Sequence, residues 1–150
     1  PNGAKVIEYN CRFGDPETQV VLPLLETDIM DIIEAVWEEK LDTLDIKWSD
    51  KSCACVVMAS GGYPEKYETG KVISGLDENG QCEGAFVYHA GTKLEDGKFL
   101  TAGGRVLGIT AYGDTLKEAL DTAYKAVDTI SFEKAHYRHD IGKKALSALK

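Results

Sequence analysis

Three polar residues near the start of the 150-residue sequence alternate in a pattern that could bind a cation and a phosphate. Glu8, Asn10 and Arg12 lie two positions apart within VIEYNCRFGDPETQ, residues 6–19. Side chains two apart on a strand point to the same face, so Glu8 and Asn10 would converge, and Arg12 would join them if the strand continues. A carboxylate and an amide carbonyl suit Mg²⁺, which completes its shell with water and substrate phosphates. The guanidinium of Arg12 would then hold a phosphate oxygen.

A simpler interpretation fits the same three residues. Glu8 and Arg12 would form an exposed ion pair on a surface strand, worth about 0–1 kcal/mol. The spacing alone leaves both interpretations open.

The elements that must position these residues begin with a predicted strand over residues 4–9, ended by the turn RFGDP. Pro16 suits the start of a short helix that runs to about Leu25. A longer helix is predicted from Asp28 to about Leu41. Its apolar residues recur at helical spacing and are expected to face the core: Ile29, Ile32, Ile33, Val36 and Trp37.

The remainder of the chain has a β-rich pattern. Residues 52–60 (SCACVVMAS) predict a strand, Asp96-Gly97 predicts a hairpin turn, and Gly103-Gly104 separates two further strand-like runs. Thr115 and Glu118 fit a capping box at the start of a second long helix. We therefore divide the chain into an α/β segment, residues 1 to about 45, and an α+β domain, about 46–150.

The charge pattern excludes some classes of partner. The net charge is −8, and residues 1–50 contain 12 acidic and 4 basic side chains, which accounts for all of it. Binding to a phosphate backbone depends on Lys and Arg, so nucleic acid is not expected as a partner. No apolar run approaches the roughly 20 residues that span a bilayer, and the start has no signal-peptide pattern, so we expect a soluble, cytoplasmic protein without membrane contact.

The cysteines and histidines are interpreted as structural. The four cysteines lack the paired C-x₂-C spacing of zinc sites and are expected to be reduced and mostly buried, with Cys53 and Cys55 on one strand face. His89 is expected to be a satisfied strand histidine, and His136 and His139 to be surface or capping residues. Arg138 and Asp140 are expected to attach the C-terminal segment to the domain.

Longer stretches carry a family resemblance. IEYNCRFGDPETQVVLPLL resembles the terminal strand and loop of the ATP-grasp domain in the phosphoribosylamine–glycine ligase (glycinamide ribonucleotide synthetase) family. GGYPEKYETGKVISGL, VYHAGTK, TAGGRVLGITAYG and YRHDIGKKAL resemble the C-terminal domain of the same family, in the same order. The resemblance covers nearly the whole chain.

The resemblance implies a fold and an activity. The expected fold is α+β, with the terminal piece of an ATP-grasp domain (1–45) followed by a small β-rich C-terminal domain with flanking helices (46–150). The family joins glycine to 5-phosphoribosylamine with ATP in purine biosynthesis, through a glycyl phosphate. Carried over, Glu8 and Asn10 would bind Mg²⁺ or Mn²⁺, and Arg12 would steady the transferring phosphoryl group. Asp15 would line the nucleotide pocket, and the loop at 61–64 (GGYP) would face the active site.

The chain departs from the family in what it lacks. The amino-substrate domain and most of the ATP-grasp fold lie upstream in such enzymes, so we expect this chain alone to be inactive and to need those domains as partners. Two alternatives remain: a non-catalytic β-rich binding or lid module, and an ATP-grasp ligase with a different substrate.

Overall fold

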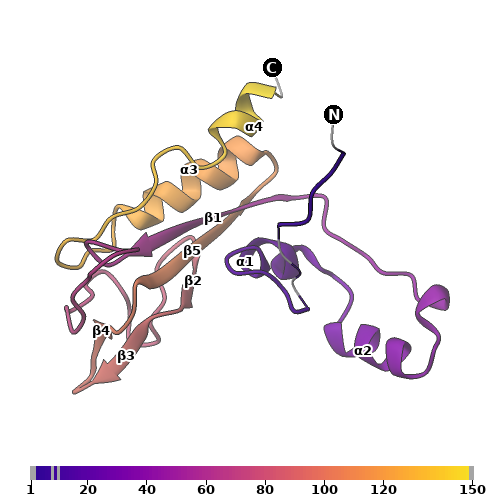
Figure 1. Cartoon of the computed structure of the whole chain (residues 1–150), viewed down its shortest axis with the longest axis horizontal. Helices are drawn as coiled ribbons and strands as arrows, with labels where there is room; N and C mark the ends of the chain where they lie inside the picture. The colour runs from indigo at the N-terminus through magenta and orange to yellow at the C-terminus, as the bar shows by residue number, and fades with distance from the viewer. Residues whose placement is uncertain (1–2, 8, 10, 149–150) are drawn as a thin grey trace.

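The computed structural model describes residues 3–7, 9 and 11–148, and it is a mixture of helices and short antiparallel strands (Figure 1). The elements, in chain order, are α1 (Thr18–Val21), the 3₁₀ turn η1 (Leu22–Leu24), α2 (Ile29–Trp37), the 3₁₀ turn η2 (Leu41–Thr43), β1 (Ser52–Ala59), β2 (Phe86–His89), β3 (Thr92–Glu95), β4 (Lys98–Thr101), β5 (Arg105–Gly113), α3 (Leu116–Val127) and α4 (Lys143–Ala148). The expected α+β fold class is confirmed.

A three-stranded antiparallel sheet in the order β1-β5-β2 is the centre of the fold. The predicted strand over residues 52–60 is confirmed as β1. Alternate residues of β1, among them Val56 and Met58, are fully buried, while Cys53 and Cys55 lie on the opposite face and are only half-buried. This alternation follows from the two-residue period of a strand, and it gives the sheet two chemically different faces.

Helix α3 covers one face of this sheet (Figure 1). The predicted capping box is present: the Thr115 hydroxyl accepts from the Glu118 N–H at 3.2 Å, and the Glu118 carboxylate accepts from the Thr115 N–H at 3.3 Å. These bonds satisfy N–H groups that the first turn of a helix leaves free. The buried residues of α3 meet those of β1 and β5 in the core: Ala119, Leu120, Ala123, Ala126 and Val127.

Strands β3 and β4 form a separate hairpin, as the Asp96-Gly97 signal predicted. Asp96 has φ 50° and Gly97 has φ 72°, so both turn residues are left-handed. That conformation matches the twist of the flanking strands, which explains the preference for Asp-Gly at this place.

The other face of the sheet carries the N-terminal part of the chain. The predicted short helix is present as α1 and η1. It is joined to β5 because the hydroxyl of Tyr112, a β5 residue, donates to the carbonyl of Pro23 in η1 at 3.4 Å. A second link joins the same region to the segment before β1, because Leu25 forms an isolated bridge with Trp48. The sheet therefore lies between α3 and the α1 segment.

Two sequence expectations for the first 45 residues are wrong. Helix α2 forms, with Asp28 as its N-cap, but none of its residues is buried, and Trp37 is 88% exposed. The helical period correctly predicted an apolar face, but no other described element covers that face. Figure 1 shows α2 lying apart from the sheet.

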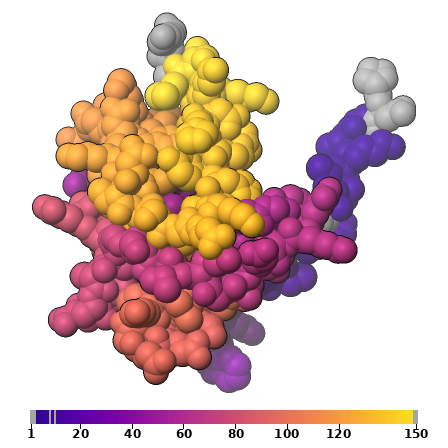
Figure 2. Space-filling view, turned by 90° about the vertical axis from the view of Figure 1, so that its left-hand side faces the viewer, coloured from indigo at the N-terminus to yellow at the C-terminus, as the bar shows by residue number. Residues whose placement is uncertain are grey.

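Residues 4–7 and 9, where a strand was expected, have no regular structure. Ile7 is 98% exposed, and Figure 2 shows the described N-terminal residues standing away from the body of the molecule. A strand needs a neighbour to pair its backbone groups, and none of the described residues lies beside this segment as a strand. No described helix is long and apolar enough to span a bilayer.

Candidate functional site

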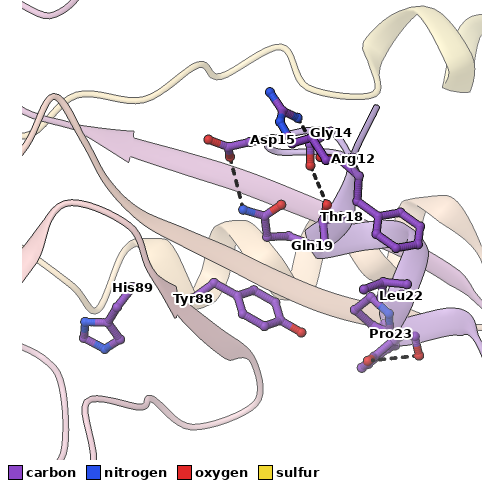
Figure 3. Close-up of a pocket in the computed structure, with 11 residues that line it drawn as sticks. Arg12, Gly14, Asp15, Thr18, Gln19, Leu22, Pro23, Tyr88 and His89 are labelled. Atoms are coloured by element: carbon purple, nitrogen blue, oxygen red, sulfur yellow. Dashed lines mark hydrogen bonds between the residues drawn. The ribbon is translucent and has the colours of Figure 1, made fainter. Parts of the chain in front are cut away.

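A groove of about 620 Å³ lies between the α1 segment and the outer face of the sheet. Figure 3 shows its two walls, with the residues before and within α1 on one side and strand residues on the other. Its lining residues are Arg12, Phe13, Gly14, Asp15, Thr18, Gln19, Leu22, Pro23, Tyr88, His89 and Tyr112. The groove has a polar end at Arg12 and Asp15 and an apolar, aromatic end near Pro23.

The loop before α1 is folded by its own hydrogen bonds. The hydroxyl and the N–H of Thr18 both donate to the carbonyl of Gly14, the latter at 3.1 Å. A Cβ on Gly14 would meet only the side chain of Glu17, with its nearest carboxylate oxygen 2.3 Å away, so Glu17 lies close over the backbone of the loop. The peptide between Asp15 and Pro16 is cis. The two hydrogen bonds from Thr18 to Gly14 close this stretch into a tight turn that leads into the helix.

The carboxylate of Asp15 is held on both sides. Its Oδ1 accepts from the Gln19 side-chain amide at 3.2 Å, and its Oδ2 lies 3.3 Å from Nη2 of Arg105. Nη1 of Arg105 also donates to the main-chain carbonyl of Asp15 at 3.0 Å. Asp15 therefore joins the loop to the first residue of β5, and both of its carboxylate oxygens are engaged.

The strand wall of the groove is aromatic. Tyr88 of β2 points into the groove (Figure 3), and the ring of Tyr112 packs edge-on against Phe86 with centroids 5.6 Å apart. Burial raises the pKa of both Tyr88 and Tyr112 above the ordinary value, so both phenols are neutral at physiological pH. This wall offers flat apolar surface with hydroxyl groups but no charge.

His89, at the edge of the groove, has both ring nitrogens in hydrogen bonds. Nδ1 lies 2.8 Å from the Thr92 hydroxyl, and Nε2 lies 2.9 Å from the carbonyl of Gly80. Both ring nitrogens therefore have hydrogen-bond partners within the protein. The expectation of a satisfied strand histidine is confirmed.

Of the four site residues predicted from the sequence, the structure brings two together. Arg12 and Asp15 line the same end of the groove, and Nη1 of Arg12 donates to the neighbouring carbonyl of Phe13 at 2.6 Å. Glu8 and Asn10, the predicted metal ligands, lie outside the described residues. Among the residues that are described, no three His, Cys, Asp or Glu side chains gather as a metal cluster would require.

Other expectations need correction. The four cysteines are free, but they are not mostly buried: Cys11 is exposed and the other three are half-buried. Arg138 and Asp140 form an exposed ion pair with each other at 2.8 Å, and it is the Tyr124 hydroxyl that holds this segment, through the carbonyl of Arg138 and the N–H of Ile141.

The loop at 61–64 was expected to face the active site, yet none of its residues lines the groove. Instead the ring of Tyr63 packs on Gly104, where a Cβ would lie 2.1 Å from the ring carbon Cδ2. This contact explains the glycine: only a residue without a side chain admits an aromatic ring so close to its backbone.

Among the residues of the site that sequence reasoning missed are Gln19, Tyr88, Arg105 and Tyr112. Tyr88 and Tyr112 lie on neighbouring strands of the sheet, and each alone is an ordinary strand residue. Arg105 is 90 positions from Asp15, so no local spacing connects the two. The available signal is the Gly-Gly-Arg stretch at 103–105, from which the sequence predicts only that Gly103-Gly104 separates two strand-like runs.

The comparisons with known proteins agree with one another. The family described as "Phosphoribosylglycinamide synthetase, C domain" matches residues 53–144. A phosphoribosylamine–glycine ligase of Caldanaerobacter subterraneus is 55% identical over 139 residues, which is 93% of this chain and 33% of that protein. A bifunctional purine biosynthetic protein of Dictyostelium discoideum is 50% identical over 96% of this chain, which is 18% of that protein.

A solved structure gives the same result for the fold. The crystal structure of a phosphoribosylamine–glycine ligase from Thermotoga maritima superposes with a TM-score of 0.70 and 34% identity, covering 90% of this chain and 32% of that one. The chain thus spans about one third of the ligases that it matches. Because the family match covers most of the chain and reaches both β1 and α3, the protein belongs to the phosphoribosylglycinamide synthetase C-domain family.

Proposed function

We propose that this chain is the C-terminal part of an ATP-dependent carbon–nitrogen ligase of purine biosynthesis. The complete enzyme joins glycine to 5-phosphoribosylamine and yields glycinamide ribonucleotide, ADP and phosphate. The chain supplies one side of the active site, and that side contains the groove between the α1 segment and the sheet.

One observation carries the proposal: the similarity extends beyond the family's C domain into the segment that forms the groove. The C-domain match begins at residue 53, whereas Arg12 and Asp15 precede it. The match to the Dictyostelium discoideum protein covers 96% of this chain, which leaves only about six residues unmatched and so includes the groove loop. Both walls of the groove therefore have counterparts in enzymes of this pathway.

The roles of the groove residues follow from their chemistry. Arg12 offers a charged planar fork, which suits the phosphoryl oxygens where negative charge gathers during transfer from ATP to the glycine carboxylate. Asp15 lines the ATP-binding end of the groove, and since both of its oxygens are engaged, it shapes that end rather than binding a metal. The aromatic wall excludes water from the reactive acyl phosphate.

The metal site is assigned to Glu8 and Asn10. Their carboxylate and amide oxygens form a hard donor set that fits Mg²⁺ or Mn²⁺, and a bound divalent ion would neutralise charge on the ATP phosphates. The remaining parts of the ATP site belong to upstream domains of the same polypeptide, so those domains are the partners of this chain. The enzyme is proposed to act in the cytoplasm on small-molecule substrates, with neither nucleic acid nor membrane as a partner.

The test is ADP release from ATP with glycine, 5-phosphoribosylamine and Mg²⁺. It compares this chain, the full-length protein and the full-length protein carrying Glu8→Gln. We expect turnover only with full-length protein, and a loss of about a hundredfold or more on substitution, since a ligand of a catalytic ion is removed. Glu83→Gln is the matched control, because Glu83 is exposed and far from the groove loop in sequence, and its rate should not change.

An inactive full-length protein, or one indifferent to Glu8, would refute the proposal and favour a non-catalytic module. Turnover with an amine or acid other than 5-phosphoribosylamine and glycine would instead identify a related ATP-grasp ligase.

A further inference from the structure

Arg105, the first residue of β5, connects the sheet to the loop before α1 through a single guanidinium group. Its Nη1 donates to the main-chain carbonyl of Asp15 at 3.0 Å, and its Nη2 lies 3.3 Å from the Asp15 carboxylate. The fork thus contacts the backbone and the side chain of one loop residue at once. A lysine has one compact charge in place of the fork and could make only one of these contacts well.

The position of Arg105 is itself fixed by a buried serine. Ser60 is 2% exposed; its hydroxyl donates to the carbonyl of Gly103 at 2.8 Å, and its N–H donates to the carbonyl of Gly104 at 2.8 Å. Both contacts hold the turn immediately before Arg105. The pairing of β1 with β5 also shifts by one residue between Met58 and Ala59, opposite Arg105. Such bulges re-aim side chains at the end of a strand.

The loop that Arg105 contacts is the one that bears Arg12. Asp15 lies three residues after Arg12, and its other carboxylate oxygen is bound by Gln19 of α1. The Gln19 side chain in turn lies over the sheet, 3.8 Å from where a Cβ of Gly108 would be. The loop is therefore held between α1 and the start of β5, while Arg12 and Phe13 face the groove.

We propose that Arg105 is a positioning residue for the phosphoryl-transfer step. It touches no reacting atom; it holds the loop of residues 12–19 so that Arg12 stays in the groove. Through Arg105, the β-rich domain sets the position of Arg12 for phosphoryl transfer. The inference rests on the proposed function for its effect on catalysis, but the contact itself can be tested separately.

The catalytic test uses the full-length protein with Arg105→Met and Arg105→Lys. Because Arg12 acts on charge that develops in the transition state, its displacement lowers kcat more than it raises the KM for glycine. We expect Arg105→Met to reduce kcat at least tenfold with KM for glycine changed less than threefold, and Arg105→Lys to recover part of the loss. The control is Arg138→Met, which removes a comparable exposed arginine–aspartate pair in the same domain, outside the groove, and should leave kcat unchanged.

A second readout does not depend on activity. The amides of Thr18, Val20 and Val21 are hydrogen-bonded within the loop and α1, so their hydrogen exchange reports how firmly the loop is held. We expect Arg105→Met to speed their exchange about tenfold or more, while the amides of β1 exchange as before. Asp15→Asn combined with Arg105→Met should add less than its own separate effect, since both substitutions remove the ion pair between the two side chains.

The outcomes separate the two proposals. If the wild-type protein is inactive, the proposed function fails, and the exchange experiment still decides whether Arg105 holds the loop. If the wild type is active but Arg105→Met matches Arg138→Met in kcat or in loop exchange, the positioning role is refuted.

Discussion

The hydroxyl of Tyr124 on α3 joins two points of the C-terminal segment. It donates to the carbonyl of Arg138 at 2.7 Å and accepts from the N–H of Ile141 at 3.2 Å. A single phenol thus lies in a hydrogen-bonded chain that attaches the residues before α4 to the domain. The neighbouring Arg138–Asp140 pair is exposed and makes no such connection within the described part of the chain.

Tyr124→Phe should therefore lower the free energy of unfolding by about 1–2 kcal/mol, because two hydrogen bonds are lost and the half-buried N–H of Ile141 loses its partner. The measurement is urea denaturation of the chain. Arg138→Gln is the control and should change stability by less than about 0.5 kcal/mol. Equal effects of the two substitutions would show that the ion pair, and not the phenol, holds the segment.

Gly80 and Gly97 have nearly the same backbone conformation but different surroundings. Their φ angles are 74° and 72°, yet a Cβ on Gly80 would lie 2.5 Å from Nε2 of His89, whereas a Cβ on Gly97 would have open space around it. Gly97→Ala should cost about 1–2 kcal/mol from the left-handed backbone alone. Gly80→Ala should cost about 1–3 kcal/mol more, because the His89 ring must move. Denaturation midpoints compare the two, and equal costs would mean that the His89 contact is not tight.

The cysteines should differ in reactivity. Burial, followed by the neighbouring Cys55, raises the pKa of the Cys53 thiol to about 11, and burial also raises the pKa of Cys55. At pH 8 only about one Cys53 in a thousand is a thiolate, so iodoacetamide should modify the exposed Cys11 first. The rate at Cys53 should rise as the pH approaches 11.

The raised pKa of Cys53 also makes the stability of the chain depend on pH. Above the ordinary thiol pKa of 9.0 the unfolded chain releases the Cys53 proton before the folded chain does. The contribution of the Cys53 thiol to the free energy of unfolding is therefore complete below pH 9 and is lost as the pH rises through about 11.

Peptide mapping after timed alkylation checks the predicted order of reaction of the two cysteines, and modification of Cys53 as fast as Cys11 at pH 8 would contradict it. Unfolded chain in urea serves as the control, in which the difference should vanish.

The apolar face of α2 should contribute little to the stability of this chain. Trp37 is 88% exposed, so Trp37→Glu removes almost no buried surface and should change the free energy of unfolding by less than about 0.5 kcal/mol. The fully buried Leu107 provides the comparison: Leu107→Ala should cost about 2–5 kcal/mol by leaving a cavity. A loss of more than about 1 kcal/mol for Trp37→Glu would show that the helix face is covered.

Local patterns in the sequence determined most of the elements. The capping box of Thr115 and Glu118, the Asp96-Gly97 turn and the alternation through β1 depend on interactions between near neighbours, so they could be predicted and are present. Arg12 was proposed from its spacing and Asp15 from the family resemblance, and the structure places both on one wall of the groove. The family was identified from motifs that are long enough to be specific.

Only the tertiary structure decided which surfaces meet. A helical period shows that α2 has an apolar face, but whether anything covers it depends on elements far away in the chain or beyond it. The contact of Arg105 with Asp15 spans 90 residues and depends on the β1–β5 pairing, the Gly103–Gly104 turn and the placement of α1 on the outer face of the sheet. No local sequence pattern predicts this contact, because it forms only when the strands pair and the α1 segment packs on the sheet, which brings residues distant in the sequence together.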